Sequence, residues 1–158
     1  MNCPRNHIAE LNIGRIRYAT DDPRMAGFME NLDRINALAE RSKGFVWRYQ
    51  DESGSATQTF RENDPLELLN VSVWETAEDL EAYVFGTLHA RFYARRYDWF
   101  ERPSGAHFVM WPVPVGHIPG TEEALEKLEE YRRAGASKRV YGWEALPNAA
   151  LWQQKRCA

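Results

Sequence analysis

The chain has 158 residues, is 44% hydrophobic and 13% aromatic, and carries a formal net charge of −3 at neutral pH. This length and apolar content suffice for one substantial core, so we expect a single domain over residues 1–158. The negative charge gives no reason to expect a nucleic acid or an anionic membrane as a partner. The apolar runs fall short of the roughly 18 residues that a membrane span needs, and Cys3 and Cys157 form no disulfide framework, so we expect a cytoplasmic protein.

The first third of the chain reads as a strand, a helix and a strand. Residues 7–14 alternate as a strand does. Asp22 is a good helix cap and Pro23 a good first helical residue, so a helix is expected to begin there. Gly44 is placed to end that helix. Residues 45–50 then predict a second strand.

The segment from Leu69 to Trp111 carries most of the side chains that can do chemistry. Residues 69–74 alternate and are rich in β-branched residues, which predicts a strand. A helix is expected after them, with Thr76 as its N-cap and a break at Gly86. A second helical piece is expected over 87–99, and residues 106–111 return as a strand.

The remaining segments are less regular. Residues 51–65 are polar and hold Gly and Pro, as a hairpin loop does. After Trp111, Pro112 and Pro114 exclude a central strand, so the chain is expected either to leave the sheet or to lie at its edge. A final helix is expected with Thr121 as its cap, and residues 139–145 predict a short strand.

The element order β-α-β-β-α-β predicts an α+β protein with a ferredoxin-like antiparallel sheet. The core is expected over residues 7–115, followed by a C-terminal helix-strand appendage over 116–158. In this fold both core helices cover one sheet face, and the other face needs its own cover. We therefore expect a homodimer that pairs sheet to sheet, which is a dimeric α/β barrel.

Alternation along the strands separates aliphatic from polar and aromatic rows. The aliphatic row Leu69, Val71 and Val73 is expected under the helices. The opposite rows are expected to line a ligand cavity on the uncovered face; they are Glu10 and Asn12, then Asn70, Ser72 and Trp74, then His107, Val109 and Trp111. The alternative is a hydrated dimer interface whose buried polar groups are hydrogen-bonded.

Four residues are candidates for catalysis. A neutral imidazole at His89 or His107 can act as a base on an acidic C–H or phenol, and the alternative is a capping or core histidine. Asn12 and Asn70 can donate hydrogen bonds to an oxyanion, or simply bond across a dimer interface.

The expected substrate-binding residues are rings, two cations and a hydroxyl. The arginines can bind a carboxylate or phenolate, although a solvated or ion-paired role is the usual one. The histidines and cysteines match no metal-site spacing, so no metal is expected. The full set is Ser72, Trp74, Tyr83, Tyr93, Trp111, Arg48 and Arg95.

Several strings resemble the domain-of-unknown-function family 3291, over about residues 7 to 136. They are HIAELNIGRIR, DDPRMAGFMENLDRINALAERSKGFVWRYQDE, LLNVSVWETAEDLEAYVFGTLHARFYARRYDWFE and FVMWPVPVGHIPGTEEALEKLE. The resemblance implies the dimeric α/β-barrel fold, whose superfamily includes antibiotic-biosynthesis and haem-degrading monooxygenases, chlorite-dismutase-like haem proteins and muconolactone isomerases. The ending VYGWEALPN departs from the short ending usual in the family.

The same resemblance places individual residues. Asn12 lies on the first strand, as the catalytic asparagine of the monooxygenases does, and His89 falls near the histidine of the simpler members. Tyr83 and Tyr93 replace the tryptophan and the haem-ligand histidine of the haem-degrading members, which argues against haem degradation.

These observations predict a small-molecule enzyme that needs no cofactor. It would be monooxygenase-like, or an isomerase or cyclase, and act on a small hydrophobic, aromatic or polyketide-like metabolite. One alternative is a haem-binding protein with a histidine axial ligand. The other is a homodimer that binds a ligand without chemistry.

Overall fold

The computed structural model describes residues 6–50, 60–61 and 64–146. Its strands form one antiparallel sheet in the order β2-β4-β1-β5, with β3 paired to β4. The strands are β1 Asn6–Arg15, β2 Phe45–Arg48, β3 Phe60–Arg61, β4 Asp64–Trp74 and β5 Phe108–Pro114. This is the strand order of a ferredoxin-like α+β protein, as predicted. β5 lies at the sheet edge, where its prolines leave no inner hydrogen bond unmade.

The helices begin and end largely where the capping residues indicate. They are η1 Pro23–Met25, α1 Ala26–Glu40, α2 Ala77–Gly86, α3 His89–Ala94, α4 Arg96–Trp99, α5 Thr121–Ala134 and η3 Trp143–Ala145. The Thr76 hydroxyl accepts a hydrogen bond from the Asp79 amide at 3.1 Å and so caps α2. The predicted break at Gly86 is confirmed. Thr121, however, is the first residue of α5, and Gly120 is its N-cap.

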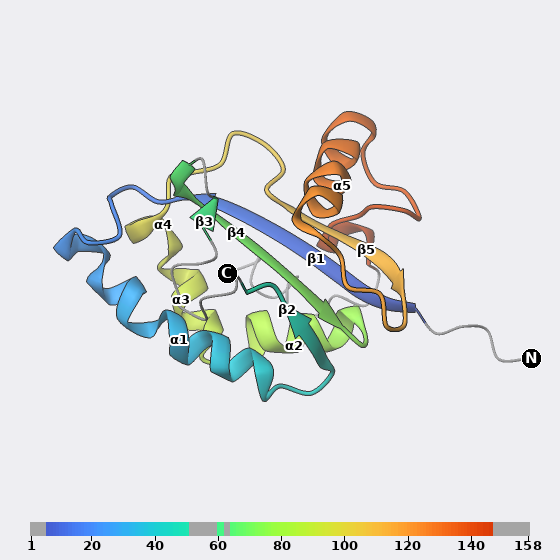
Figure 1. Ribbon diagram of the computed structural model, residues 1–158, viewed down its shortest axis with the longest axis horizontal. Coiled ribbons are helices and arrows are strands. Elements are labelled where there is room, and N and C mark those ends of the chain that lie inside the picture. The colour runs from blue at the N-terminus through green and yellow to red at the C-terminus, as the bar shows by residue number, and fades with distance from the viewer. Residues whose placement is uncertain (1–5, 51–59, 62–63, 147–158) are drawn as a thin grey trace, which may run out of the picture.

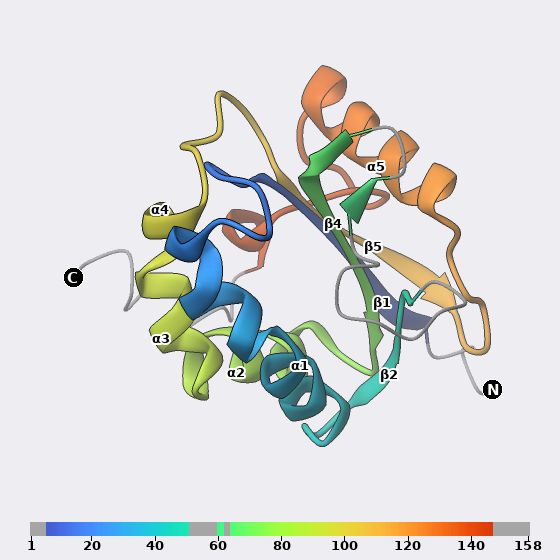
Figure 2. The same cartoon turned by 60° about the vertical axis from the view of Figure 1, so that its left-hand side comes forward.

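The two faces of the sheet carry different covers. Helices α1, α2, α3 and α4 lie on one side of the sheet and α5 on the other (Figures 1 and 2). We call the two sides the helix-side face and the α5 face. No helix in the described ranges combines the length and the apolar content that a membrane crossing requires.

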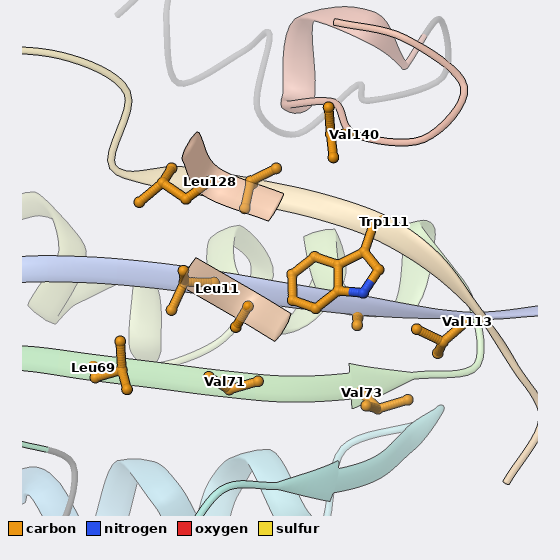
Figure 3. Close-up of a cluster of buried hydrophobic side chains, with 11 residues drawn as sticks. Leu11, Leu69, Val71, Val73, Trp111, Val113, Leu128 and Val140 are labelled. Atoms are coloured by element: carbon orange, nitrogen blue, oxygen red, sulfur yellow. The ribbon is translucent and has the colours of Figure 1, made fainter. Parts of the chain in front are cut away.

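The α5 face holds an aliphatic core, which corrects one prediction. The row Leu69, Val71 and Val73 was expected under the core helices, but it packs toward Leu128 of α5 and Val140 (Figure 3). The C-terminal appendage therefore supplies cover that the prediction reserved for a second subunit. This face is already covered within one chain, so it gives no reason to expect a sheet-to-sheet partner. The homodimer stays a prediction.

The chain after α5 wraps around the edge of β5. Val140 belongs to the α5-face core, whereas Trp143 belongs to the helix-side core. Between them, Tyr141 exchanges two backbone hydrogen bonds with Met110 of β5, at 2.7 and 3.0 Å. The Trp143 ring then stacks on Phe108 at 5.1 Å. The strand predicted over residues 139–145 is thus a single bridge followed by a helical turn, and it covers the β5 edge.

Candidate active site

The strand register gathers polar residues on the helix-side face. Glu10 of β1 pairs with Ser72 of β4, and Ser72 pairs with Arg48 of β2. Residues directly paired in antiparallel strands project to the same face, so these three side chains form a line across three strands, which we call the polar row. One step along the strands Asn12 pairs with Asn70, and we call these two residues the amide pair.

A bulge in β2 brings Arg48 into this row. The register between β2 and β4 shifts between Phe45 and Trp47. Phe45 therefore packs in the helix-side core and Trp47 against the α5-face core, although strict alternation would put them on one face. After the bulge, Arg48 returns to the face that carries Glu10.

Glu10 is a buried carboxyl, and only one of its two oxygens has a hydrogen-bond partner among the described residues. The residue is 3% exposed. Its Oε1 accepts a hydrogen bond of 2.6 Å from the Ser72 hydroxyl, which in turn accepts one of 2.9 Å from the Trp74 indole. Its Oε2 is buried and has no hydrogen-bond partner among the described residues. Burial raises the pKa of Glu10 to about 8, against the lowering effect of the Ser72 hydrogen bond.

Three rings stand in series beside the polar row. Trp74 stacks on Tyr83 with 5.2 Å between ring centroids, and Tyr83 contacts the His89 ring at 4.9 Å. The Tyr83 hydroxyl donates a hydrogen bond of 3.1 Å to the Ile35 carbonyl of α1, which fixes the ring against the helix layer. Burial raises the pKa of Tyr83, so its phenol stays protonated.

His89 is held as a neutral imidazole at the start of α3. Burial lowers its pKa, and the hydrogen bond to the Val84 carbonyl only partly opposes this. Nδ1 lies 3.0 Å from that carbonyl oxygen, so Nδ1 carries the proton and donates it. Nε2 then presents its lone pair, as in a base or a metal-bound histidine. The predicted helix break at Gly86 is what places His89 here.

Two predicted site residues lie on the wrong face. Trp111 pairs with Ala9 and packs in the α5-face core. His107 hydrogen-bonds through its carbonyl to the Ile13 amide, one step after the Asn12–Phe108 pair, so it shares the α5-face register. In β5 it is Phe108 and Met110 that belong with Glu10 and Asn12. Because the side-chain period of a strand is two, an error of one residue moved the whole predicted β5 row.

The prediction also placed the polar rows on the wrong side of the sheet. Asn12, Asn70, Ser72 and Trp74 do share one face, but that face lies under α1 and α2 and not on an uncovered side. Burial lowers the pKa of His107, which lies apart from this group.

Two further predicted binding residues, Arg95 and Tyr93, interact with side chains close to them. Arg95 forms an ion pair of 3.0 Å with Asp98, and its guanidinium lies 4.9 Å from the Trp99 ring centroid. Tyr93 packs edge-on against Phe85 at 5.4 Å in the helix-side core. Neither side chain is recorded in contact with the polar row or the amide pair, so the structure does not join them to the other candidates.

Glu10 is the site residue that sequence reasoning underrated. It was placed in the correct row but given no chemical role. The available signal was the single carboxylate of the strand HIAELNIG, which stands between the apolar residues Ala9 and Leu11. A charge at a position that must face a core is uncommon unless it is paired or used.

Two other features of the surface and composition do not coincide with this site. A depression of about 590 Å³ lies between the loop before β5 and the end of α5, lined by Ser104, Gly105, Ala106, Tyr131, Arg132, Gly135 and Ala136. Its one cation, Arg132, is occupied by the Ala106 carbonyl and Glu129.

Within the described part of the chain, no cluster of three or more His, Cys, Asp or Glu residues is arranged to hold a metal ion. Cys3 and Cys157 lie outside the described residues.

Strand order and helix placement define an α+β protein of the ferredoxin-like class. The chain belongs to the DUF3291 family, a domain of unknown function, whose model matches residues 7–157. No curated protein matches the chain.

Several solved structures align with the chain. NE2512, a protein of unknown function from Nitrosomonas europaea, aligns with 12% identity and a TM-score of 0.50 over 75% of this chain and 99% of its own. A candidate antibiotic biosynthesis monooxygenase from Nitrosomonas europaea aligns with 14% identity and a TM-score of 0.48, over 76% and 99%. SnoaB, a cofactor-independent oxygenase from Streptomyces nogalater, aligns with 12% identity and a TM-score of 0.49, over 73% and 99%. At 12% identity the likeness to NE2512 concerns the fold alone.

Proposed function

We propose that this protein is a small-molecule enzyme that works without a cofactor, and that Glu10 transfers a proton to and from an aromatic or polyketide-like substrate. The observation that carries the proposal is the buried Oε2 of Glu10, which has no hydrogen-bond partner among the described residues and lies beside the amide pair. A carboxyl in an apolar setting with a raised pKa is a frequent form of catalytic acid or base.

A purely structural role explains this arrangement poorly. Burying a carboxyl without a cation partner costs several kcal/mol that an aliphatic residue at the same position would avoid. The single hydrogen bond from Ser72 returns only about 1.5–3 kcal/mol. The amide pair adds polar groups for which no hydrogen bond is recorded among the described residues, and such amides suit a substrate oxygen.

The chemistry follows from the position of these groups. Ionised Glu10 removes a proton from an acidic C–H, and the amides of Asn12 and Asn70 donate to the enolate oxygen that forms. Return of the proton to a different carbon gives an isomerisation. With dioxygen as co-substrate, a CH₂ group and O₂ give C=O and water, which balances without an external reductant. Neutral His89 is a second candidate base, and Trp74, Tyr83 and Ser72 support the carboxyl.

Hydrogen–deuterium exchange tests this proposal before the substrate is known. The probe is 2-tetralone, whose C–H groups next to the carbonyl exchange on enolisation, followed by NMR in D₂O. We expect the wild-type protein to accelerate exchange, with a rate that rises with pH through about 8 as Glu10 ionises. Glu10→Gln should lower the rate by roughly 100-fold or more. Glu123→Gln, on α5 beside His117, is the matched control and should not change it.

Two outcomes contradict the proposal. One is a wild-type protein that leaves the exchange rate at its buffer value. The other is a Glu10→Gln variant with the wild-type rate and pH profile. Loss of exchange in His89→Gln alone would transfer the base to His89, since its neutral Nε2 is the other available lone pair.

Haem binding is a second candidate, favoured by one feature of His89. An imidazole whose Nδ1 donates to a backbone carbonyl has the orientation common among metal-bound histidines. Addition of hemin should then give a Soret band that is lost in His89→Ala and kept in His117→Ala. A Soret band that both variants retain excludes His89 as the ligand.

A further inference from the structure

A cation shares the polar row with the proposed proton-transfer group but does not neutralise it. Arg48 and Glu10 both pair with Ser72, from its two neighbouring strands. Their backbones are therefore about two strand spacings, roughly 10 Å, apart. Glu10 is hydrogen-bonded to Ser72, whereas Arg48 Nε contacts Glu40 Oε1 of α1 at 2.8 Å. The row thus has a proton-transfer centre and, separately, a cationic end.

Within the part of the chain that the structure describes, most of the Arg48 guanidinium has no hydrogen-bond partner. Only Nε has a hydrogen-bond partner among the described residues, so the two terminal nitrogens keep their donors. The Arg48 side chain is 19% exposed, whereas that of Glu40 is 43% exposed. The cation is therefore the more enclosed member of the pair, and its carboxylate partner lies on the solvent side. A guanidinium with free, parallel N–H groups binds a carboxylate through two hydrogen bonds.

Tyr83 lies within electrostatic reach of both ends. The charge of Glu10 raises the pKa of its phenol and the charge of Arg48 lowers it. Tyr83 is itself stacked on Trp74, whose indole is bound to Ser72. The Trp74 and Tyr83 rings therefore form an aromatic wall near both the carboxyl and the cation, which favours a flat apolar ligand body.

We propose that the substrate is an aromatic carboxylate, whose carboxylate is bound by Arg48 while its reacting C–H lies at Glu10. This assignment rests on the proposed function for the identity of the reacting end. The carboxylate subsite itself depends only on Arg48, the aromatic wall and the strand register. Glu40 holds Arg48 through Nε in the absence of substrate, and its negative charge opposes binding of the ligand carboxylate at the terminal nitrogens.

Binding of two matched probes tests the assignment by isothermal titration calorimetry. 2-Naphthoate carries the carboxylate, and 2-naphthamide has the same ring system without the charge. We expect the wild-type protein to bind 2-naphthoate at least about tenfold more tightly than 2-naphthamide, a difference of about 1.4 kcal/mol. In Arg48→Gln the ratio should fall to near one, and Arg48→Lys should keep part of it.

The variant Glu40→Gln gives a result that a structural ion pair does not predict. If Arg48 and Glu40 only stabilise the fold, the two substitutions should affect binding alike. If the negative charge of Glu40 opposes the ligand carboxylate, Glu40→Gln should tighten 2-naphthoate binding a few-fold and leave 2-naphthamide unchanged. Arg139→Gln removes a similar Arg–Glu pair, that of Arg139 with Glu130, and should not change either affinity.

The failure of this inference is distinguishable from that of the proposed function. An unchanged affinity ratio in both Arg48 variants overturns the carboxylate subsite, and so does the absence of saturable binding of either probe to the wild-type protein. Glu10→Gln should keep the ratio while abolishing proton exchange. A wild-type protein with the expected affinity ratio but no proton exchange would contradict the role of Glu10 alone. A protein with proton exchange but no preference for 2-naphthoate would contradict the role of Arg48 alone.

Discussion

The two faces of the sheet are built from the same strands and differ in almost every physical respect. On the α5 face, Leu11, Val71 and Val109 are at most 1% exposed and surrounded by aliphatic side chains. On the helix-side face, the alternate residues of β1 and β4 are Glu10, Asn12 and Ser72. The α5 face buries aliphatic side chains, whereas the helix-side face also buries polar groups, whose burial weakens the fold. Each face holds an apolar cluster. We expect the α5 face to contribute more to stability than the polar part of the helix-side face, to which the proposed chemistry is assigned.

The largest effect is expected from a cavity in the α5 face. Leu11 is fully buried beside Val71 and Val109, so Leu11→Ala should lower the free energy of unfolding by about 4 kcal/mol. Urea denaturation followed by circular dichroism measures this change. Val46→Ala, at a 40% exposed position of β2, should cost less than about 1 kcal/mol. A loss below about 1 kcal/mol for Leu11→Ala would show that this face is not the main source of stability.

Glu10 should give the helix-side face a pH-dependent cost. Its pKa is about 8 when folded and 4.5 when unfolded, so between these values the folded chain keeps a proton that the unfolded chain has lost. The free energy of unfolding should therefore fall as pH rises, by roughly 3–4 kcal/mol between pH 5 and pH 8. In Glu10→Gln this fall should disappear. Denaturation series at both pH values measure it, and equal slopes in the two proteins contradict a raised pKa.

Tyr83 links the helix-side face to α1 through one hydrogen bond. Tyr83→Phe keeps the ring stacked on Trp74 but removes the hydrogen bond from its hydroxyl to the Ile35 carbonyl. The expected loss of unfolding free energy is about 1–2 kcal/mol. The matched control is Tyr97→Phe, which should be nearly neutral. The Tyr97 ring contacts Arg96 and Arg102, and its hydroxyl has no hydrogen-bond partner among the described residues. Equal effects in the two variants would remove the Tyr83 hydroxyl from the support of the site.

Local signals in the sequence predicted the elements well because they act over a few residues. The Thr76 cap, the break at Gly86 and the prolines of β5 are each set by neighbouring backbone groups. The alternation along β4 also separated Leu69, Val71 and Val73 correctly from Asn70, Ser72 and Trp74. Which of these rows meets which helix depends on tertiary packing, and alternation carries no information about it.

The errors at the site have the same origin. The β5 row was assigned before its pairing with β1 was known, and a shift of one residue exchanged His107 and Trp111 for Phe108 and Met110. The bulge that turns Arg48 toward Ser72 has no clear signature in the string FVWR. The cover of the α5 face depends on a helix that follows the core in sequence, so inspection of the core alone suggested a missing partner.

The smallest expected effect separates the stability of the helix-side face from its chemistry. Ser72 donates a hydrogen bond that favours the ionised form of Glu10, so Ser72→Ala should raise the pKa of Glu10. The pH midpoint of 2-tetralone exchange should then move upward, while the free energy of unfolding falls by about 1 kcal/mol. Thr76→Ala also removes a hydrogen-bonded hydroxyl and should cost a similar free energy. Its exchange midpoint should stay at the wild-type value, because Thr76 caps α2 and does not touch Glu10. If both variants moved the midpoint equally, the pKa of Glu10 would report on overall stability and the Ser72–Glu10 hydrogen bond would have no separate role in proton transfer.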